Sequence, residues 1–127
     1  MSTQIPNELK YTSDHEWTKL DNGYALIGIT DFAQSSLGDI VYVELPEEGS
    51  TLTKGSSFGV VESIKSVSDL YAPLSGTVEE INKKLPDQPD LLNANPYAAW
   101  MIKLKISDST EIDTLLSADQ YKEHCNN

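Results

Sequence analysis

Two short runs of β-branched and aromatic residues flank Lys65, near the middle of the chain. Such runs favour half-buried strands, and the reversal between them contains no Gly, Asn or Pro. A type I turn, which most residues tolerate, therefore fits better than the primed turns that require glycine. Within the segment 59–78 we expect a β-hairpin with Lys65 exposed at its tip. The residues that carry the β bias are Phe58, Val60, Val61, Ile64, Val67, Leu70 and Tyr71.

Small neighbours, Ser63 and Ser66, leave the Lys65 amine accessible to another protein, which is what a modifying enzyme requires. On position alone, an exposed lysine in a turn is more often only a solubilising charge. A Schiff-base nucleophile would instead need burial or a cationic neighbour to lower the pKa of its amine, with an acid or base nearby. A serine-flanked hairpin tip offers neither, so a catalytic lysine fits poorly.

The composition excludes several classes of function. A formal net charge of −11, with only nine Lys and Arg residues, argues against a nucleic-acid-binding surface, which needs clustered positive charge. The N-terminal residues lack a basic and an apolar signal region, and no apolar run approaches the length of a membrane-spanning helix. We therefore expect neither a nucleic-acid partner nor a membrane partner.

Cysteine and histidine are too few and too scattered to support a disulfide framework or a metal site. The single cysteine, Cys125, has no intramolecular partner, which fits a reducing compartment. His15 and His124 stand at opposite ends of the sequence, so a shared metal ion is unsupported. We expect His15 to be a hydrogen-bonded structural residue.

The first half of the chain has the pattern of strands around one short helix. Residues 10–17 and 24–29 are expected to pair as a hairpin, because the Asp-Asn-Gly sequence at 21–23 between them is a strong turn signal. After the helix, residues 39–45 are the most β-like run in the chain and end at Pro46.

Residues 31–37 have the signals of that short helix. Thr30 and Asp31 are suitable N-cap residues, and Gln34 completes a possible capping box with Asp31. Gly38 is placed to end the helix.

The second half continues with strands at 76–81 and 100–106, separated by a proline-punctuated irregular stretch. In this half of the chain, helices are expected only at the C-terminal end. Asp108 with Glu111 can form a capping box for a helix around 112–116, and Ser117 with Gln120 can start a second one.

The length of the chain fits a single domain over residues 1–127. Residues 1–7 are expected to be a loose N-terminus, and residues 107–127 a C-terminal helical region.

Many positions match one known family, in order and over nearly the whole chain. They are 11–12, 15–17, 28–31, 33–34, 37–39, 43–46, 62–65, 68–69, 72–73, 75–76 and Asn93. In these residues the chain closely resembles the H proteins of the glycine cleavage system, with 62–65 matching their lipoyl-lysine segment. The resemblance implies a mainly β fold with short peripheral helices, the barrel-sandwich hybrid of lipoyl and biotinyl domains. In this fold two small antiparallel sheets pack face to face, and the modified lysine lies on an exposed hairpin.

The function that the resemblance implies is that of a non-catalytic carrier with lipoate in amide linkage on Lys65. Such a carrier takes up the aminomethyl group left when a glycine decarboxylase (P protein) removes CO₂ from glycine. An aminomethyltransferase (T protein) then takes the one-carbon unit, and dihydrolipoamide dehydrogenase (L protein) reoxidises the dithiol. A lipoate ligase or an octanoyl or lipoyl transferase attaches the cofactor. The expected location is the cytoplasm, or the mitochondrial matrix in a eukaryote, and a monomer is expected.

The resemblance further implies a cleft on the protein surface that shelters the loaded arm. Its matching residues here are Glu16 and, four residues after the lysine, Asp69; Asp14 stands where relatives often have another small polar residue. An aminomethyl group held by sulfur can be lost to water when its nitrogen lone pair expels the thiol. A carboxylate that holds the ammonium form, preferably that of Glu16, would prevent this loss. The alternative is that Glu16 and Asp69 are ordinary surface carboxylates.

Three related readings remain beside this one. Biotin-carrying domains typically have methionines around the target lysine, whereas Lys65 lies between Ile64 and Ser66, and the lipoyl domains of 2-oxo acid dehydrogenases usually have Asp before the lysine. Both fit poorly. An H-like relay that passes lipoyl groups to other enzymes, without glycine cleavage, is hardly separable by sequence.

One segment departs from the family pattern. The family generally has Pro-Tyr-Gly, two further residues and Trp, whereas residues 96–100 read Pro-Tyr-Ala-Ala-Trp, one residue shorter and without glycine. A positive φ is costly without glycine, so we expect this loop to take another path.

Overall fold

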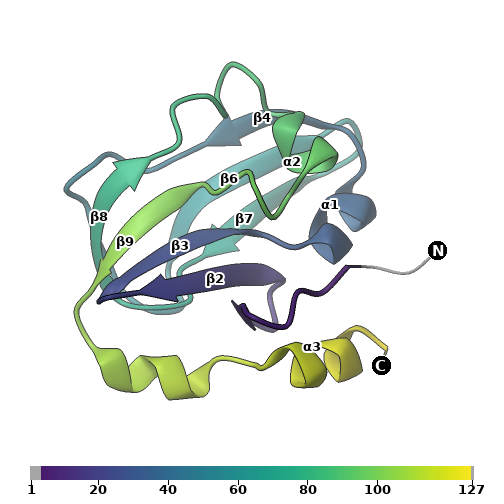
Figure 1. Ribbon diagram of the computed structural model, residues 1–127. Coiled ribbons are helices and arrows are strands. Elements are labelled where there is room, and N and C mark those ends of the chain that lie inside the picture. Colours follow the sequence, from purple (N-terminus) through teal and green to yellow (C-terminus); the bar gives the residue numbers. More distant parts are fainter. Residues whose placement is uncertain (1–3, 127) are drawn as a thin grey trace.

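The computed structural model describes residues 4–126 as two antiparallel β-sheets with short helices at their edges (Figure 1). The larger sheet has the strand order β1-β2-β3-β9-β8-β5, and the smaller has the order β4-β6-β7. The predicted mainly β fold with peripheral helices is therefore confirmed. The larger sheet contains β1 (Lys10–Tyr11), β2 (Glu16–Asp21), β3 (Tyr24–Ile29), β9 (Ile102–Ile106), β8 (Gly76–Ile81) and β5 (Thr51–Leu52), and the smaller one contains β4 (Ile40–Glu44), β6 (Ser57–Ser63) and β7 (Val67–Tyr71).

The first long hairpin forms where the Asn-Gly signal predicts it. β2 pairs with β3 from Glu16 opposite Ile29 to Asp21 opposite Tyr24. Asn22 and Gly23 both have positive φ, 50° and 86°, as a two-residue type I′ turn requires. The twist of this turn matches that of the flanking strands, which fixes the register of the hairpin.

The prediction of one continuous strand over residues 10–17 is wrong. The chain reverses between β1 and β2, so that Lys10 pairs with Thr18 and Tyr11 with Trp17. The Thr12 carbonyl accepts a hydrogen bond from the His15 N–H at 3.1 Å, and the Glu16 carbonyl accepts one from the Thr12 N–H at 3.0 Å. The polar residues 12–15 form a turn because their side chains and backbone form local hydrogen bonds. The strand-forming residues on either side led to the prediction of a continuous strand.

Helix α1 (Asp31–Leu37) has the predicted bounds and one of the two predicted N-cap residues, but the predicted capping box does not form. The side chain of Thr30 accepts a hydrogen bond from the Ala33 N–H at 3.1 Å, so Thr30 is the N-cap. Gln34 bonds to the Asp31 side chain at 2.8 Å and forms no capping box with it. Gly38 ends the helix with φ 83°, as predicted.

The chain after β8 contains a helical turn that the sequence did not predict, α2 (Leu91–Ala94). After β9, a 3₁₀-helix over Ser109–Thr114 replaces the helix expected around 112–116. Asp108 caps it through the Thr110 N–H. Glu111 does not complete the predicted box, because its carboxylate instead accepts hydrogen bonds from the backbone N–H and hydroxyl of Ser75.

Helix α3 (Ala118–Cys125) begins with the predicted capping box. The Gln120 N–H donates to Ser117 Oγ at 3.2 Å, and the Ser117 N–H donates to Gln120 Oε1 at 2.9 Å. Both helical segments of the C-terminal region run along one edge of the molecule, beneath β2 in the view of Figure 1.

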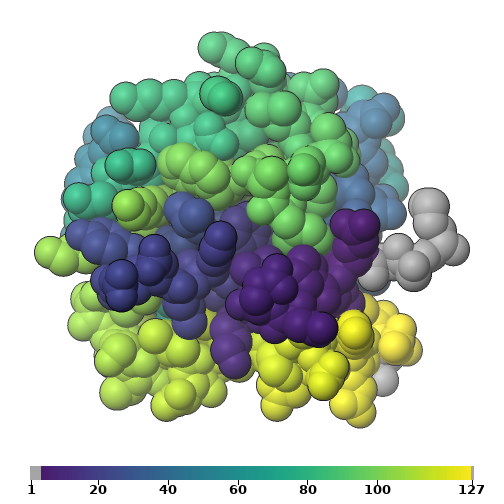
Figure 2. Space-filling view, in the orientation of Figure 1, coloured from purple at the N-terminus to yellow at the C-terminus, as the bar shows by residue number. Residues whose placement is uncertain are grey.

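Two hydrophobic clusters hold the fold together. The main one lies between the sheets, where fully burying each aliphatic side chain contributes about 1.5–3 kcal/mol. The smaller one joins α3 to β1 and β2, and Figure 2 shows the N-terminal and C-terminal residues side by side on this face. Its buried members are Leu9, Tyr11, Trp17, Ala118 and Tyr121.

The N-terminal residues 4 and 6 form hydrogen bonds to the rest of the fold. Of the N-terminus expected to be loose, residues 1–3 lie outside the described residues, while the Gln4 N–H donates to Asp31 and the Pro6 carbonyl accepts from Tyr11.

In the loop 96–100, which departs from the family pattern, the Pro96 carbonyl accepts a hydrogen bond from the Trp17 indole at 3.0 Å. Among the described non-glycine residues positive φ occurs only at His15 and Asn22, so no residue of the loop 96–100 has a positive φ.

Candidate functional site

Lys65 lies exposed in the turn between β6 and β7, as predicted. The two strands pair from Ser57 opposite Tyr71 to Glu62 opposite Val67, which leaves a four-residue connection over 63–66. No residue in this connection has a positive φ, so the turn is not a primed type. An amine at this position is free to meet the active site of another protein.

Hydrogen bonds from both sides hold the turn that carries Lys65. Ser63 closes it, because its N–H donates to the Ser66 carbonyl at 2.8 Å and its hydroxyl oxygen accepts from the Ser66 N–H at 3.1 Å. Outside the hairpin, the Ile64 N–H donates to the Asp39 carbonyl at 3.0 Å. The lysine therefore projects from a fixed base, although its side chain is solvated.

Asn93 supports this base from behind. Its side chain accepts a hydrogen bond from the Ile40 N–H at 2.9 Å and donates to the Gly38 carbonyl at 2.9 Å and to Gln34 at 3.0 Å. These bonds fix residues 38–40, which hold the lysine turn through Asp39. A Cβ built on Gly38 would lie 3.6 Å from Lys65 Cε, so the lysine stem passes over the end of α1. The support by Asn93 could not be foreseen from an isolated asparagine in an irregular stretch.

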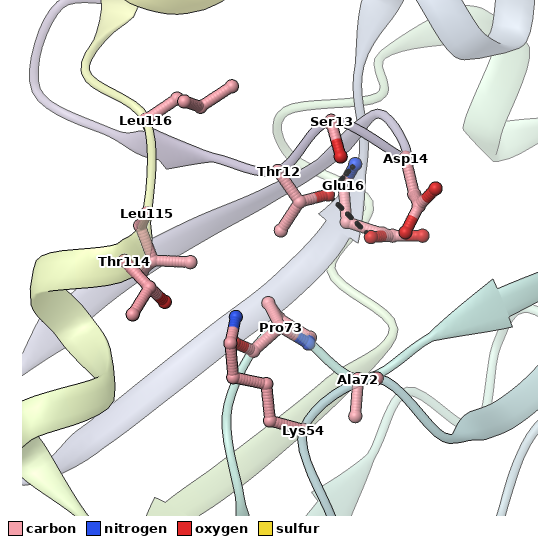
Figure 3. A pocket seen from close by; sticks show the side chains of 11 residues that line it. Thr12, Ser13, Asp14, Glu16, Lys54, Ala72, Pro73, Thr114, Leu115 and Leu116 are labelled. Carbon is pink, nitrogen blue, oxygen red and sulfur yellow. Dashed lines mark hydrogen bonds between the residues drawn. The ribbon is translucent and has the colours of Figure 1, made fainter.

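A second feature is a cavity of about 330 Å³ that is walled by four separate segments (Figure 3). The turn 12–16 forms one wall, the end of the 3₁₀-helix and the residues after it form another, and residues 54–55 before β6 and 72–73 after β7 form the rest. The lining residues are Thr12, Ser13, Asp14, Glu16, Lys54, Gly55, Ala72, Pro73, Thr114, Leu115 and Leu116. The cavity therefore unites positions more than 100 residues apart.

Glu16 is the buried acid of this cavity, with 2% of its surface exposed. The Thr12 hydroxyl donates to its Oε1 at 2.6 Å, and the Tyr71 N–H donates to its Oε2 at 3.3 Å. Burial raises the pKa of Glu16 from 4.5 to about 7, although both hydrogen bonds oppose this rise. A carboxyl group with a pKa near neutrality, at a cavity wall, is typical of a functional site. The reading of Glu16 as an ordinary surface carboxylate is wrong.

The other acids predicted for the cleft lie differently. Asp14 lines the cavity beside Glu16, and its charge adds to the rise of the Glu16 pKa. Asp69 is exposed on β7, opposite Val60, and is not among the residues that line the cavity. It stands between Lys65 and Tyr71 along the strand. Lys54, which no sequence pattern singled out, also lines the cavity, where its amine lies 3.4 Å from the Pro73 carbonyl.

The outer face of the smaller sheet is apolar and acidic, and we call it the lysine face. Its large exposed hydrophobic side chains are Val41, Tyr42, Ile64, Val67 and Tyr71. Tyr42, Glu62 and Val67 stand in one row across the three strands, and Glu44, Val60 and Asp69 stand in the next row. Exposed apolar side chains that gather beside acidic ones are typical of a surface that meets another protein.

The two histidines meet although they are far apart in the sequence. Their ring centroids lie 5.4 Å apart, and His15 Nδ1 lies 2.7 Å from the Tyr121 hydroxyl. His15 is therefore a hydrogen-bonded structural residue, as predicted. Within residues 4–126 no group of three or more His, Cys, Asp or Glu side chains is placed to hold a metal ion. None of the described helices is long and apolar enough to cross a membrane.

Comparisons with known proteins identify relatives over almost the whole chain. The family model described as glycine cleavage H-protein matches residues 9–127. Two proteins named glycine cleavage system H protein, from two strains of Staphylococcus epidermidis, are 54% and 53% identical over 120 residues, which are 94% of this chain and 95% of each relative. A crystal structure of a glycine cleavage system H protein from Mycobacterium marinum superposes with a TM-score of 0.88 at 39% identity, over 97% of this chain and all of that one.

Proposed function

Because this chain belongs to the glycine cleavage H-protein family and is the lipoyl carrier of a glycine cleavage system, we propose that Lys65 bears the lipoyl group. The observation that carries this assignment is the position of Lys65, exposed in a turn whose backbone is held on both sides. An attaching enzyme needs a free primary amine in a defined place, and this position offers one. When bound in amide linkage, lipoate supplies the disulfide and thiol chemistry of the carrier.

The chain's own part in the process is carriage rather than catalysis. A group tethered to a fixed turn reaches each partner's active site at high effective concentration once the two proteins dock. The carrier takes the aminomethyl group of glycine from the decarboxylase to the aminomethyltransferase, and then presents the dithiol to the dehydrogenase. Lys65 therefore acts by position, and its amine is consumed in the linkage.

Strand β7 leads from the turn of Lys65 toward the cavity around Glu16. The strand from Val67 to Tyr71 covers about 13 Å. An extended lipoyl-lysine side chain is roughly 15 Å long by ordinary bond lengths. The Tyr71 N–H at the far end of this path already points at Glu16. Asp69, midway along β7, stands beside the same path.

Glu16 is suited to hold the ammonium form of the cargo. A carboxylate can accept about four hydrogen bonds, and Thr12 and Tyr71 supply two. Two acceptor positions are therefore left for an ammonium group inside the cavity. The arriving positive charge favours ionisation of Glu16, whose pKa of about 7 in the empty cavity then falls. The resulting ion pair keeps the nitrogen protonated and prevents it from expelling the thiol.

The lysine face is where the partners meet the carrier. It adjoins the turn that carries Lys65, the residue that each partner must reach, and it combines exposed Tyr42 and Val67 with the acidic Glu44 and Glu62. A partner surface with an apolar centre and a basic rim complements this arrangement. We expect such a surface on the decarboxylase, the aminomethyltransferase, the dehydrogenase and the enzyme that attaches lipoate.

The relay that passes lipoyl groups to unrelated enzymes is not favoured, because the matched relatives are named for glycine cleavage. The curated relatives described above come from bacteria, which supports the cytoplasm as the place of function.

Site-specific attachment tests the assignment of Lys65. The chain is co-expressed with a lipoate ligase and the product is digested for peptide mapping by mass spectrometry. We expect one lipoyl adduct, on Lys65, and none on the cavity residue Lys54, which serves as an internal control. An adduct on any other lysine, with Lys65 unmodified, would refute the assignment.

A further inference from the structure

The C-terminal segment of the chain does more than cover one edge of the sheet. Thr114, Leu115 and Leu116 form one wall of the Glu16 cavity. Four further lining residues belong to the turn 12–16, directly opposite in Figure 3. The shape of the cavity therefore depends on how the C-terminal segment is fixed to this turn.

Backbone and ring contacts dock the C-terminal segment against the strand that leads into the turn. Tyr11 and Leu116 exchange two backbone hydrogen bonds, at 2.9 and 2.7 Å. The rings of Tyr11 and Tyr121 stack with centroids 4.6 Å apart and an angle of 6° between their planes. These contacts bring α3 under the turn, but they do not themselves reach the turn residues.

The turn itself is held by side chains of α3. His124 Nε2 lies 3.0 Å from the carbonyl oxygen of Ser13, and the Tyr121 hydroxyl lies 2.7 Å from His15 Nδ1 and 2.8 Å from Thr30 Oγ1. Tyr121 is completely buried, so no water competes for its hydroxyl. One oxygen thus joins three segments: α3, the turn, and the N-cap of α1.

His15 is the turn residue that most needs this support. Its φ of 70° lies in the left-handed region, which a side chain other than glycine adopts at a cost. Its ring is clamped between the Phe32 ring, stacked at 4.5 Å, and the Tyr121 hydroxyl. Burial and the neighbouring His124 lower the pKa of His15, so the ring is neutral at pH 7 and its Nδ1 can share a proton with the tyrosine.

We propose that Tyr121 is a positioning residue for the cavity: its hydroxyl fixes His15, and thereby holds the adjacent Glu16 in its buried place. Glu16 follows His15 directly and starts β2, so a change in the His15 backbone moves the carboxyl group first. The link to cargo protection rests on the proposed function of Glu16, whereas the link from Tyr121 to the burial of Glu16 does not.

The variant Tyr121→Phe isolates the hydroxyl. It keeps the ring that stacks on Tyr11 but removes the bonds to His15 and Thr30. The turn then relaxes, water enters the cavity, and the burial that raises the Glu16 pKa is reduced. We expect the Glu16 pKa to fall by about one unit and the loaded carrier to lose its amine several times faster than the wild type.

The matched control is Tyr97→Phe. Tyr97 is only partly buried, but like Tyr121 it has a bonded hydroxyl, which donates to the Gln4 carbonyl, accepts from the Asp31 N–H and does not contact the turn. We expect this control to leave the Glu16 pKa unchanged even if it costs a similar amount of stability. Because Tyr121→Phe leaves an unpaired buried group, His124→Ala at an exposed position provides a second variant with an intact core.

The readout is an NMR titration of ¹³C-labelled glutamate side chains in the unloaded protein, with thermal unfolding recorded beside it. A fall in the Glu16 pKa in Tyr121→Phe, absent from Tyr97→Phe, supports the positioning role. Should Tyr121→Phe fail to fold, His15→Asn takes its place, because it removes the same bond from the turn side and asparagine tolerates a positive φ; His124→Ala keeps the Tyr121 hydroxyl and reports only on the Ser13 contact. An unchanged Glu16 pKa in the folded variant overturns the inference. If the pKa falls but amine loss is unaltered, the positioning stands and the protective role proposed for Glu16 is refuted.

Discussion

The backbone N–H of Tyr71 donates a hydrogen bond to the buried carboxyl group of Glu16, 55 residues earlier in the chain. Tyr71 is the last residue of the strand that begins beside Lys65, and Glu16 is the first residue of β2. This bond connects the hairpin of the carrier lysine to the acid of the cavity. Under the proposed function, an arm on Lys65 would lie along this path when it is sheltered.

Replacement of Glu16 by Gln should change how stability depends on pH. The Glu16 pKa is raised in the folded state, so the folded chain binds the proton more tightly than the unfolded chain. This contribution is fully present below about pH 4.5 and is lost as the pH rises through about 7. Between pH 5 and 8 the wild type should therefore lose roughly 2–3 kcal/mol of unfolding free energy relative to Glu16→Gln.

Urea unfolding at each pH measures this difference, and Glu44→Gln, at an exposed position, is the control. A constant difference between wild type and Glu16→Gln across the range would show that the carboxyl group is not buried in solution.

The same substitution should shorten the life of the loaded carrier. Gln keeps the shape of Glu16 but cannot pair with an ammonium group. A hydrogen bond to a charged group contributes about 1.5–3 kcal/mol, so amine release should be roughly tenfold faster or more. Release of ammonia from the isolated loaded proteins is the measurement. Equal rates for Glu16→Gln and wild type would exclude this role, and lipoylation should be the same in both.

Asn93→Ala should disturb the lysine turn from a distance. It removes three hydrogen bonds that fix residues 38–40, at a cost of roughly 2–3 kcal/mol in unfolding free energy. We expect slower lipoylation of Lys65 in the folded variant, because the base of the turn is loosened. Asn82→Ala is the control, since Asn82 bonds to Trp100 and Lys84. Equally fast lipoylation of Asn93→Ala would mean that the turn needs no such support.

Tyr42→Ser tests the lysine face as a docking surface. An exposed side chain contributes little to folding, so stability should change by no more than about 0.5 kcal/mol. The apparent affinity of the partner enzymes for the carrier should nevertheless fall several-fold, seen as a higher KM in the reconstituted system. Tyr24→Ser, on the larger sheet, is the control and should leave KM unaltered. A KM unchanged by Tyr42→Ser would place the docking surface elsewhere.

Local patterns were sufficient to predict the parts of the fold that depend on local chemistry. The Asn22-Gly23 turn and the capping box of Ser117 and Gln120 form as predicted, because their bonds lie within a few residues. Glu111 has the same spacing from Asp108 but bonds to Ser75, 36 residues away. A contact with a distant segment overrides the local option, and no local pattern reveals it.

In the candidate site, too, features set by local sequence could be predicted, and features set by distant contacts could not. The exposure of Lys65 follows from the turn that carries it, so it could be predicted. Family resemblance pointed to Glu16, but its burial depends on Thr12 and Tyr71 and on a cavity wall from the other end of the chain. The meeting of His15 with His124 likewise requires the docking of α3, which the sequence separation concealed.

Reconstitution with the three partner enzymes tests the central claim most directly. Glycine-dependent reduction of NAD is measured with lipoylated wild type, with Lys65→Arg and with the control Lys83→Arg at an exposed position away from the cavity, after lipoate ligase treatment of all three. Arginine keeps the charge at an exposed turn and should change stability by no more than about 0.5 kcal/mol, but guanidinium cannot form the lipoyl amide. The account predicts activity for wild type and Lys83→Arg and none for Lys65→Arg. Sustained turnover with Lys65→Arg would contradict it.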